Sequence, residues 1–233
     1  MFLFNISRYN YCEVKKMRLF KKCLLVLGII LLILSGYIIF RSDTFIDDAS
    51  TNHGWNLVLV NHTNRIPDNY KVILTKLNNG KEVDSRIVPE LSQMFQDARK
   101  DDIYMQVNEG YRSSYSQQKI LDNRTDYYKS KGLFTLLARR YALNYVSAPG
   151  TSEHQLGLAV DIGGDNRYTT NQSAYRWLER NAYKYGFVKR YPQNKTSITH
   201  IKHEPWHYRY VGKKAALKMH QKNLCLEEYV ESL

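Results

Sequence analysis

The sequence predicts an α+β fold with a small, mainly antiparallel sheet flanked by helices. Two observations predict it: segments of strand character and of helical periodicity are interspersed along the chain, and hairpin-like links join them. No internal repeat or low-complexity tract interrupts this pattern. A chain of 233 residues can bury one sizeable domain and still carry an appendage.

The first recognisable segment is residues 23–40, a run of 18 residues without a charge. At about 1.5 Å per residue, a helix of this length is close to the minimum that spans a bilayer core. Five Lys and Arg residues lie just before it, at positions 15–22, which by the positive-inside rule keeps the N-terminus in the cytoplasm. We therefore expect a cytoplasmic basic segment (1–22), one transmembrane anchor (23–40), a stalk (41–54) and an extracellular domain (55–233).

A cleaved signal peptide is the alternative interpretation of this run, and Ser35-Gly36 offers a weak cleavage site inside it. The run exceeds the usual apolar region of a signal peptide, about 7–15 residues, and no small-x-small pattern precedes Arg41. A buried core helix fits less well, because the run is apolar on every face. We favour a retained anchor. Met17 is an alternative start to Met1, since nothing before it has the pattern of a folded segment.

The predicted strands of the outer domain are short and bounded by turn residues. Residues 104–108 alternate between polar and apolar side chains, as a half-buried strand does. Residues 158–162 form an apolar run that ends at Gly163-Gly164, which is typical of a buried strand. The other predicted strands are residues 56–60, 71–77, 187–191 and 207–211.

Apolar residues at helical spacing predict the helices between these strands. Residues 89–100 place four apolar side chains on one face and carry Pro89 in the first turn. Ser113 or Ser114 can cap a helix that runs toward Lys131, where Gly132 ends it. Further helices are predicted at residues 133–144, at residues 173–185 and from residue 213 onward.

Charge and cysteine usage agree with an outer domain that faces an anionic surface. The net charge is +12, of which residues 1–22 carry +5 and the remainder +7. The chain has no Lys/Arg-dense helix or base-stacking motif, so we expect no nucleic-acid partner. Cys225 is the one cysteine beyond the apolar run, so the outer domain cannot form an internal disulfide and relies on its core, and on any metal that it binds, for stability. We expect the protein to be a monomer.

Two segments carry the residue types of a catalytic zinc site. His154 and Asp161 flank a glycine, and His207 follows Glu204 by three residues. Two His and one Asp are a zinc set that leaves the fourth position for water, while Glu204 is a spare carboxylate that can accept a proton from that water. Taken singly, each residue has a simpler interpretation: a surface His, a capping Asp, or a His beside the core residue Trp206.

The surroundings of these residues favour the metal interpretation over the simpler ones. Asp161 lies within an apolar strand, where a carboxylate needs a partner. Pro205 excludes an ordinary central strand or helix interior between Glu204 and His207, so the chain bends there and can direct both side chains into one cleft.

These motifs resemble those of the VanY-type D-Ala-D-Ala carboxypeptidases, zinc peptidases of the superfamily that also contains lysostaphin-like enzymes and the hedgehog signalling domain. The resemblance rests on Ser-Glu-His-Gln-x-Gly-x-Ala-x-Asp at residues 152–161 and on Glu-Pro-Trp-His-Tyr-Arg-Tyr-Val-Gly at residues 204–212. It extends over about residues 55–212, where Gly110-Tyr111-Arg112-Ser113 and the segment 185–192 also match. It implies a hedgehog/D-Ala-D-Ala-peptidase-like fold.

The resemblance implies a role for each of eight residues. His154, Asp161 and His207 bind Zn²⁺, and Glu204 is the catalytic base. Arg112 stabilises charge on the attacked carbonyl group. Gln117, Ser152 and Tyr191 line the substrate site. One departure is the segment 199–203, which replaces a stretch that more often carries Gly and an aromatic residue, so its substrate contacts differ from the family pattern.

The function that the resemblance implies is removal of the terminal D-Ala from peptidoglycan stem peptides ending in D-Ala-D-Ala. Such an activity serves glycopeptide (vancomycin) resistance or ordinary wall remodelling. Two alternatives remain open: an L,D-carboxypeptidase acting on shortened stems, and a non-catalytic wall-binding module. The presence of Glu204 and Arg112 beside the ligand set argues against the binding module.

Overall fold

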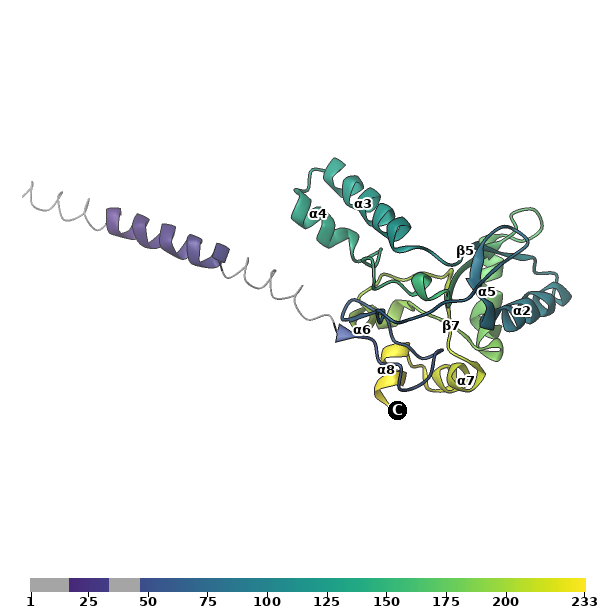
Figure 1. Ribbon diagram of the computed structural model, residues 1–233. Coiled ribbons are helices and arrows are strands. Elements are labelled where there is room, and N and C mark those ends of the chain that lie inside the picture. Colours follow the sequence, from purple (N-terminus) through teal and green to yellow (C-terminus); the bar gives the residue numbers. More distant parts are fainter. Residues whose placement is uncertain (1–16, 34–46) are drawn as a thin grey trace, which may run out of the picture. The chain divides into compact units, whose positions relative to one another are not determined.

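The computed structural model describes residues 17–33 and 47–233, which fall into two separate units (Figure 1). Residues 17–33 are a helix whose leucine and isoleucine side chains are exposed. None of the helices in these two ranges is both long and apolar enough to span a bilayer. The anchor predicted at residues 23–40 and the stalk predicted at 41–54 lie partly outside the described residues, as does most of the cytoplasmic segment 1–22.

The centre of residues 47–233 is a four-stranded sheet in the order β5-β6-β8-β7, with every neighbouring pair antiparallel. The bounds of these strands are Met105–Glu109 (β5), Ala159–Gly164 (β6), His207–Tyr210 (β8) and Phe187–Lys189 (β7). The α+β fold with a small antiparallel sheet is therefore confirmed. Its middle strands, β6 and β8, carry two of the predicted ligands, Asp161 and His207, which pair with each other in the register of these strands.

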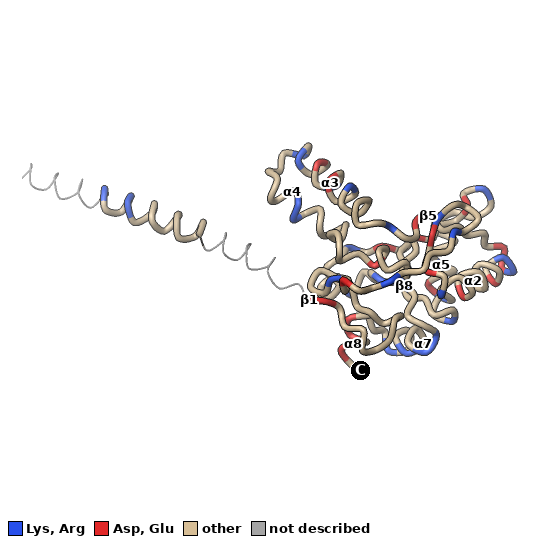
Figure 2. The backbone as a smooth tube through the Cα atoms, in the orientation of Figure 1, with Lys and Arg blue, Asp and Glu red and all other residues tan. Residues whose placement is uncertain are grey.

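Helices cover the sheet and extend from it (Figure 1). The longer ones are α2 (Val88–Lys100), α3 (Ser114–Ser130), α4 (Thr135–Ala142), α5 (Asn171–Asn181), α7 (Lys213–Lys222) and α8 (Leu226–Glu231). Helices α2 and α5 share the main core with the sheet, α7 and α8 pack over a second cluster of apolar side chains, and α3 and α4 form a hairpin with a small core of its own. Lys and Arg are distributed over α2, α3, α4 and α7 instead of gathering on one element (Figure 2).

Short elements complete the unit. They are the parallel pair β1 (Asp47–Asp48) and β2 (Asn64–Arg65), the antiparallel hairpin β3 (Leu74–Lys76) and β4 (Glu82–Asp84), the 3₁₀ turns η1 (Ser85–Ile87), η2 (Glu153–Leu156), η3 (Ala182–Tyr185) and η4 (Gln193–Lys195), and the single turn α6 (Thr196–Thr199).

Most predicted elements are present, but the short strands β1, β2 and β4 and the turn α6 were not predicted, and two further differences have a physical reason. The strand predicted at residues 56–60 is wrong, although Val58 and Val60 are buried in the core as its apolar pattern requires. Its carbonyl oxygens are used by a side chain instead of a neighbouring strand: Arg209 Nη2 donates to Asn56 O (3.2 Å) and Val58 O (3.0 Å). Helix α8 was not predicted, because six residues are too few to show a helical period.

Gly157 joins η2 to β6 and so places His154 relative to Asp161. Its φ of +71° lies in the left-handed region, where it ends the 3₁₀ turn. A Cβ at this position would lie 2.9 Å from the backbone nitrogen of Asp84. The turn therefore needs glycine for its backbone conformation and for the close approach of a neighbouring segment.

We expect Gly157→Ala to destabilise the protein more than Gly132→Ala. Both glycines have positive φ, but a Cβ at Gly132 meets nothing within 4 Å. The left-handed backbone costs about 1–2 kcal/mol at either position, and overpacking adds roughly 1–3 kcal/mol at Gly157 alone. Denaturant unfolding of both variants measures the difference in the free energy of unfolding. Equal losses would show that the contact with Asp84 does not constrain the turn.

Candidate active site

The eight residues singled out from the sequence line one cavity of about 250 Å³. Helix α3 and the segment before it contribute Arg112 and Gln117, and η2 and the residue before it contribute His154 and Ser152. The remaining wall consists of Asp161 from β6, Tyr191 and Glu204 from the segment between β7 and β8, and His207 from β8. The cavity thus brings together the predicted ligands, base and substrate-contacting residues.

Three side chains converge at the floor of this cavity. Asp161 Oδ1 lies 3.1 Å from His207 Nδ1 and 3.5 Å from His154 Nε2. One ligand atom from each of the three residues lies within 4.8 Å of the other two. The antiparallel register of β6 and β8 produces this convergence, because Asp161 and His207 are directly opposite each other.

The hydrogen bonds of these side chains leave their facing atoms available to a metal. His154 Nδ1 donates to the carbonyl oxygen of Gly110 (2.7 Å), so the lone pair of that imidazole is on Nε2, toward Asp161. Asp161 Oδ1 is buried and has no hydrogen-bond partner among the described residues. Two imidazole nitrogens and one carboxylate oxygen form a donor set that fits Zn²⁺ and leaves a coordination position open.

Burial and neighbouring charge set the protonation of this set before a metal binds. Burial acts to lower the pKa of His207, but the nearby carboxylates of Asp161, Glu153 and Glu204 outweigh it and raise the pKa to about 9. Burial also opposes the charge of Asp161, yet His154 and His207 hold its pKa well below the usual range. A cation that enters the site therefore meets an ionised Asp161 and displaces a proton from His207.

Glu204 lies beside the three predicted ligands but is not one of them. Its backbone N–H donates to Tyr191 O (3.1 Å), the turn at residues 205–206 follows, and its Oε2 lies 3.5 Å from His207 Nδ1. Burial raises the pKa of Glu204 to about 7, with the charge of Asp161 adding to the effect and His207 and Arg112 opposing it. A carboxylate of this pKa can accept and return a proton near neutral pH.

Arg112 presents a cation to the same cavity. Its Nη1 donates to Gln117 Oε1 (2.9 Å), and Gln117 Nε2 in turn donates to Ser147 O (2.7 Å), so both side chains are oriented. The backbone N–H of Arg112 donates to His154 O (3.1 Å), which ties it to the ligand segment. Its Nε is buried without a partner among the described residues and can donate to a bound group.

Ser152 and Tyr191 form buried parts of the wall. Tyr191 is 6% exposed, and its ring centroid lies 4.9 Å from that of His207. Burial raises the pKa of Tyr191 well above its ordinary value, so its hydroxyl group remains a hydrogen-bond donor. Ser152 is 4% exposed and directly precedes η2.

The cavity also contains residues that the sequence did not point to. Arg124 lies two helical turns beyond Gln117 on α3, and this spacing of seven residues places both on one face. The guanidinium of Arg124 lies 5.2 Å from the ring centroid of Tyr145, which also lines the cavity. Helical spacing from Gln117 is the signal that could have identified Arg124. Ile201 belongs to the segment 199–203 that departs from the family pattern, and it too lines the cavity.

Comparison with known proteins agrees with this site. Residues 80–213 match the profile of the family described as "VanY: D-alanyl-D-alanine carboxypeptidase". The chain is 49% identical over 178 residues to a D-alanyl-D-alanine carboxypeptidase of Enterococcus faecalis, an alignment that covers 76% of this chain and 66% of that protein. The chain therefore spans about two thirds of the length of this curated relative.

Two solved structures are each similar to about three quarters of the chain. The structure of VanYB in complex with D-alanine-D-alanine has a TM-score of 0.75 at 50% identity and covers 76% of this chain and 98% of its own. A mutant of the vancomycin resistance D,D-pentapeptidase VanY from a VanB-type resistance cassette, in complex with Zn(II), has a TM-score of 0.74 at 50% identity and covers 76% and 99%. The chain belongs to the VanY family of D-alanyl-D-alanine carboxypeptidases.

Proposed function

We propose that this protein is a zinc-dependent D,D-carboxypeptidase that removes the C-terminal D-Ala from peptidoglycan stem peptides ending in D-Ala-D-Ala. The convergence of His154, Asp161 and His207 beside a separate Glu204 carries the proposal. Family membership supports it, as do the complexes of the similar VanY proteins with Zn(II) and with D-alanine-D-alanine. In a cell exposed to glycopeptides, this reaction removes the drug's target.

The proposed mechanism gives chemical tasks to the three ligands, to Glu204 and to Arg112. Zinc, when held by the three ligands, supplies a Lewis acid that acidifies water and polarises the scissile carbonyl group. Glu204 accepts a proton from the attacking water as its oxygen bonds to the carbonyl carbon. Arg112 donates to the carbonyl oxygen as negative charge develops there. When the C–N bond breaks, Glu204 returns the proton to the leaving amine, so the proton count balances.

Recognition of a free C-terminus requires a cation or a cluster of donors for its carboxylate. Arg112 and Arg124 bring two guanidinium groups to the cavity, and Gln117, Ser152 and Tyr191 add further polar groups to its lining. Two guanidinium groups in the cavity suit a substrate that ends in a free carboxylate. These features favour an exopeptidase.

Synthetic stem peptides test the proposed activity. We expect the zinc-loaded protein to release one D-Ala from a pentapeptide ending in D-Ala-D-Ala and nothing from the tetrapeptide, as followed by mass spectrometry. Release from the tetrapeptide would instead identify an L,D-carboxypeptidase that remodels the wall. Absence of release from both, with zinc bound, would identify a wall-binding module.

A Glu204→Gln variant tests the assignment of the base. We expect it to retain one zinc per chain and to lose roughly 10²–10⁴-fold in kcat/KM, because the amide cannot accept the proton of the attacking water. Glu179→Gln is the control, since Glu179 pairs with Lys189 on the surface and its side chain is 61% exposed. Zinc content by metal analysis and turnover of the pentapeptide are the two measurements. Loss of zinc from Glu204→Gln would make Glu204 a ligand, and near-normal turnover would exclude it as the base.

The same proposal places the catalytic domain outside the cell on a single-pass anchor at residues 23–40. The uncharged run and the basic residues before it support this topology, with the N-terminus in the cytoplasm. The net charge of +7 beyond residue 22 suits an anionic wall. We propose a monomer as the working unit, since the cavity of a single chain contains the predicted ligands, Glu204 and Arg112.

Alkaline carbonate extraction of membranes tests the anchor. We expect the full chain to remain in the membrane pellet, because carbonate does not remove a spanning helix, and a chain lacking residues 1–40 to appear in the soluble fraction. N-terminal sequencing of the cell-associated protein is the second measurement. A mature chain that begins after residue 36 would show that the run is a cleaved signal peptide.

A further inference from the structure

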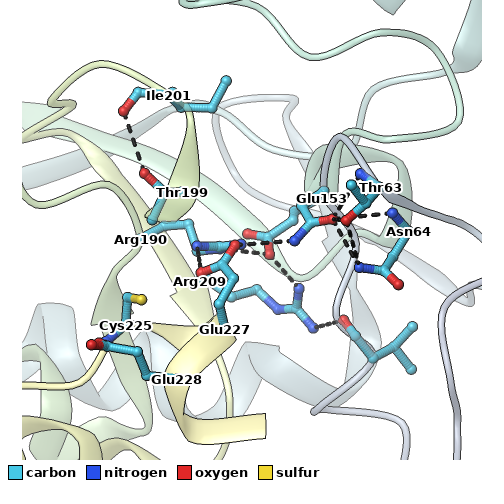
Figure 3. Close-up of polar contacts among 12 residues, drawn as sticks. Thr63, Asn64, Glu153, Arg190, Thr199, Ile201, Arg209, Cys225, Glu227 and Glu228 are labelled. Atoms are coloured by element: carbon cyan, nitrogen blue, oxygen red, sulfur yellow. Dashed lines mark hydrogen bonds and ion pairs between the residues drawn. The ribbon is translucent and has the colours of Figure 1, made fainter. Parts of the chain in front are cut away.

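Glu153 is a fully buried carboxylate for which the proposed reaction has no task. It is next to the ligand His154 in η2, yet its side chain is 0% exposed and is not among the residues that line the cavity. Burying a carboxylate is costly unless other charges and donors compensate for it. The compensation comes from two arginines that are themselves fully buried, Arg190 and Arg209 (Figure 3).

The two arginines hold one oxygen of Glu153 and are each held by further contacts. Oε1 accepts from Arg190 Nε (2.8 Å) and from Arg209 Nη1 (2.9 Å). Arg190 also forms a two-fold contact with Glu227 of α8, Nη1 to Oε2 at 2.8 Å and Nη2 to Oε1 at 2.6 Å. Arg209 is bound on its other side by the backbone carbonyls of residues 56 and 58. Arg190 and Arg209, each fixed by its own further contacts, therefore hold the Glu153 carboxylate in position.

The other oxygen of Glu153 faces a zinc ligand. Oε2 lies 3.8 Å from His207 Nε2, and both atoms are buried without a hydrogen-bond partner among the described residues. The opposite nitrogen of the same ring, Nδ1, is the atom 3.1 Å from Asp161. A shift of roughly 0.6–1 Å closes the gap between Nε2 and Oε2 to hydrogen-bond length.

We infer that Glu153, held by Arg190 and Arg209, is the positioning residue of the zinc ligand His207. Its free oxygen accepts the Nε2–H of the imidazole, which places the lone pair on Nδ1, the side of the ring that faces His154 and Asp161. A carboxylate behind a metal-bound imidazole also increases the basicity of the ligand. The inference rests on the proposed zinc site and concerns how one ligand is oriented there.

The pair of variants Glu153→Gln and Glu227→Gln separates this role from a merely structural one. Both substitutions remove a carboxylate that is bound to Arg190, but Glu153 alone faces His207. We expect Glu153→Gln to weaken zinc binding by about 10–100-fold and Glu227→Gln to leave it within about twofold of the wild type. Competition of the full chain against a chromophoric chelator measures the zinc Kd, and circular dichroism confirms that each variant is folded.

Equal zinc affinity of the wild type and Glu153→Gln would overturn the inference while leaving the zinc site intact. Failure of the wild type to bind zinc would instead reject the proposed function. A second measurement does not depend on the variant folding: the ¹⁵N resonances of His207 in the zinc-loaded wild type. We expect a protonated, slowly exchanging Nε2 and a metal-bound Nδ1. Zinc bound through Nε2, or an Nε2 without its proton, would contradict the assigned role of Glu153.

Discussion

The pairing of β6 with β8 is the constraint on which the rest of the site depends. It sets Asp161 opposite His207 in the middle of the sheet, where the carboxylate and the imidazole lie 3.1 Å apart. Together with His154 from η2, these two side chains form a group that could hold a metal ion. The turn at Gly157 and the bend at residues 205–206 both act at the ends of these two strands, so they set the spacing of the ligands and of Glu204.

Charge in and around the site is divided between two layers. The cavity contains Asp161 and Glu204, whose charges a bound dication and Arg112 can balance. Behind it, Glu153 and Glu227 are balanced by Arg190 and Arg209 without any metal. Buried ion pairs of this kind add little net stability compared with apolar packing, but breaking one is costly, so they favour a single arrangement of the chain. A single arrangement of these ion pairs suits their position behind the cavity, where Glu153 is proposed to hold His207 in one orientation.

Sequence patterns predicted the chemistry of the site better than its surroundings. Two imidazoles and a carboxylate within an apolar strand, followed by a bent Glu-Pro-Trp-His segment, predicted a metal site and a nearby base, and these residues do lie together in one cavity. Glu153 was present in the same motif, but its partners Arg190 and Arg209 are 37 and 56 residues away, and no local pattern links them. Another long-range contact of Arg209 accounts for the error at residues 56–60, because its Nη2 donates to the carbonyl oxygens of Asn56 and Val58, which a neighbouring strand would otherwise use.

X-ray absorption at the zinc edge of the purified full chain tests the central claim most directly, since it reports the atoms bound to the metal. The account predicts one zinc per chain, with a nitrogen and oxygen shell at about 2.0–2.2 Å, scattering from two imidazoles, and the same spectrum in a Glu204→Gln variant. A zinc–sulfur shell at about 2.3 Å, scattering from fewer than two imidazoles, or a spectrum that changes when Glu204 is replaced would contradict it.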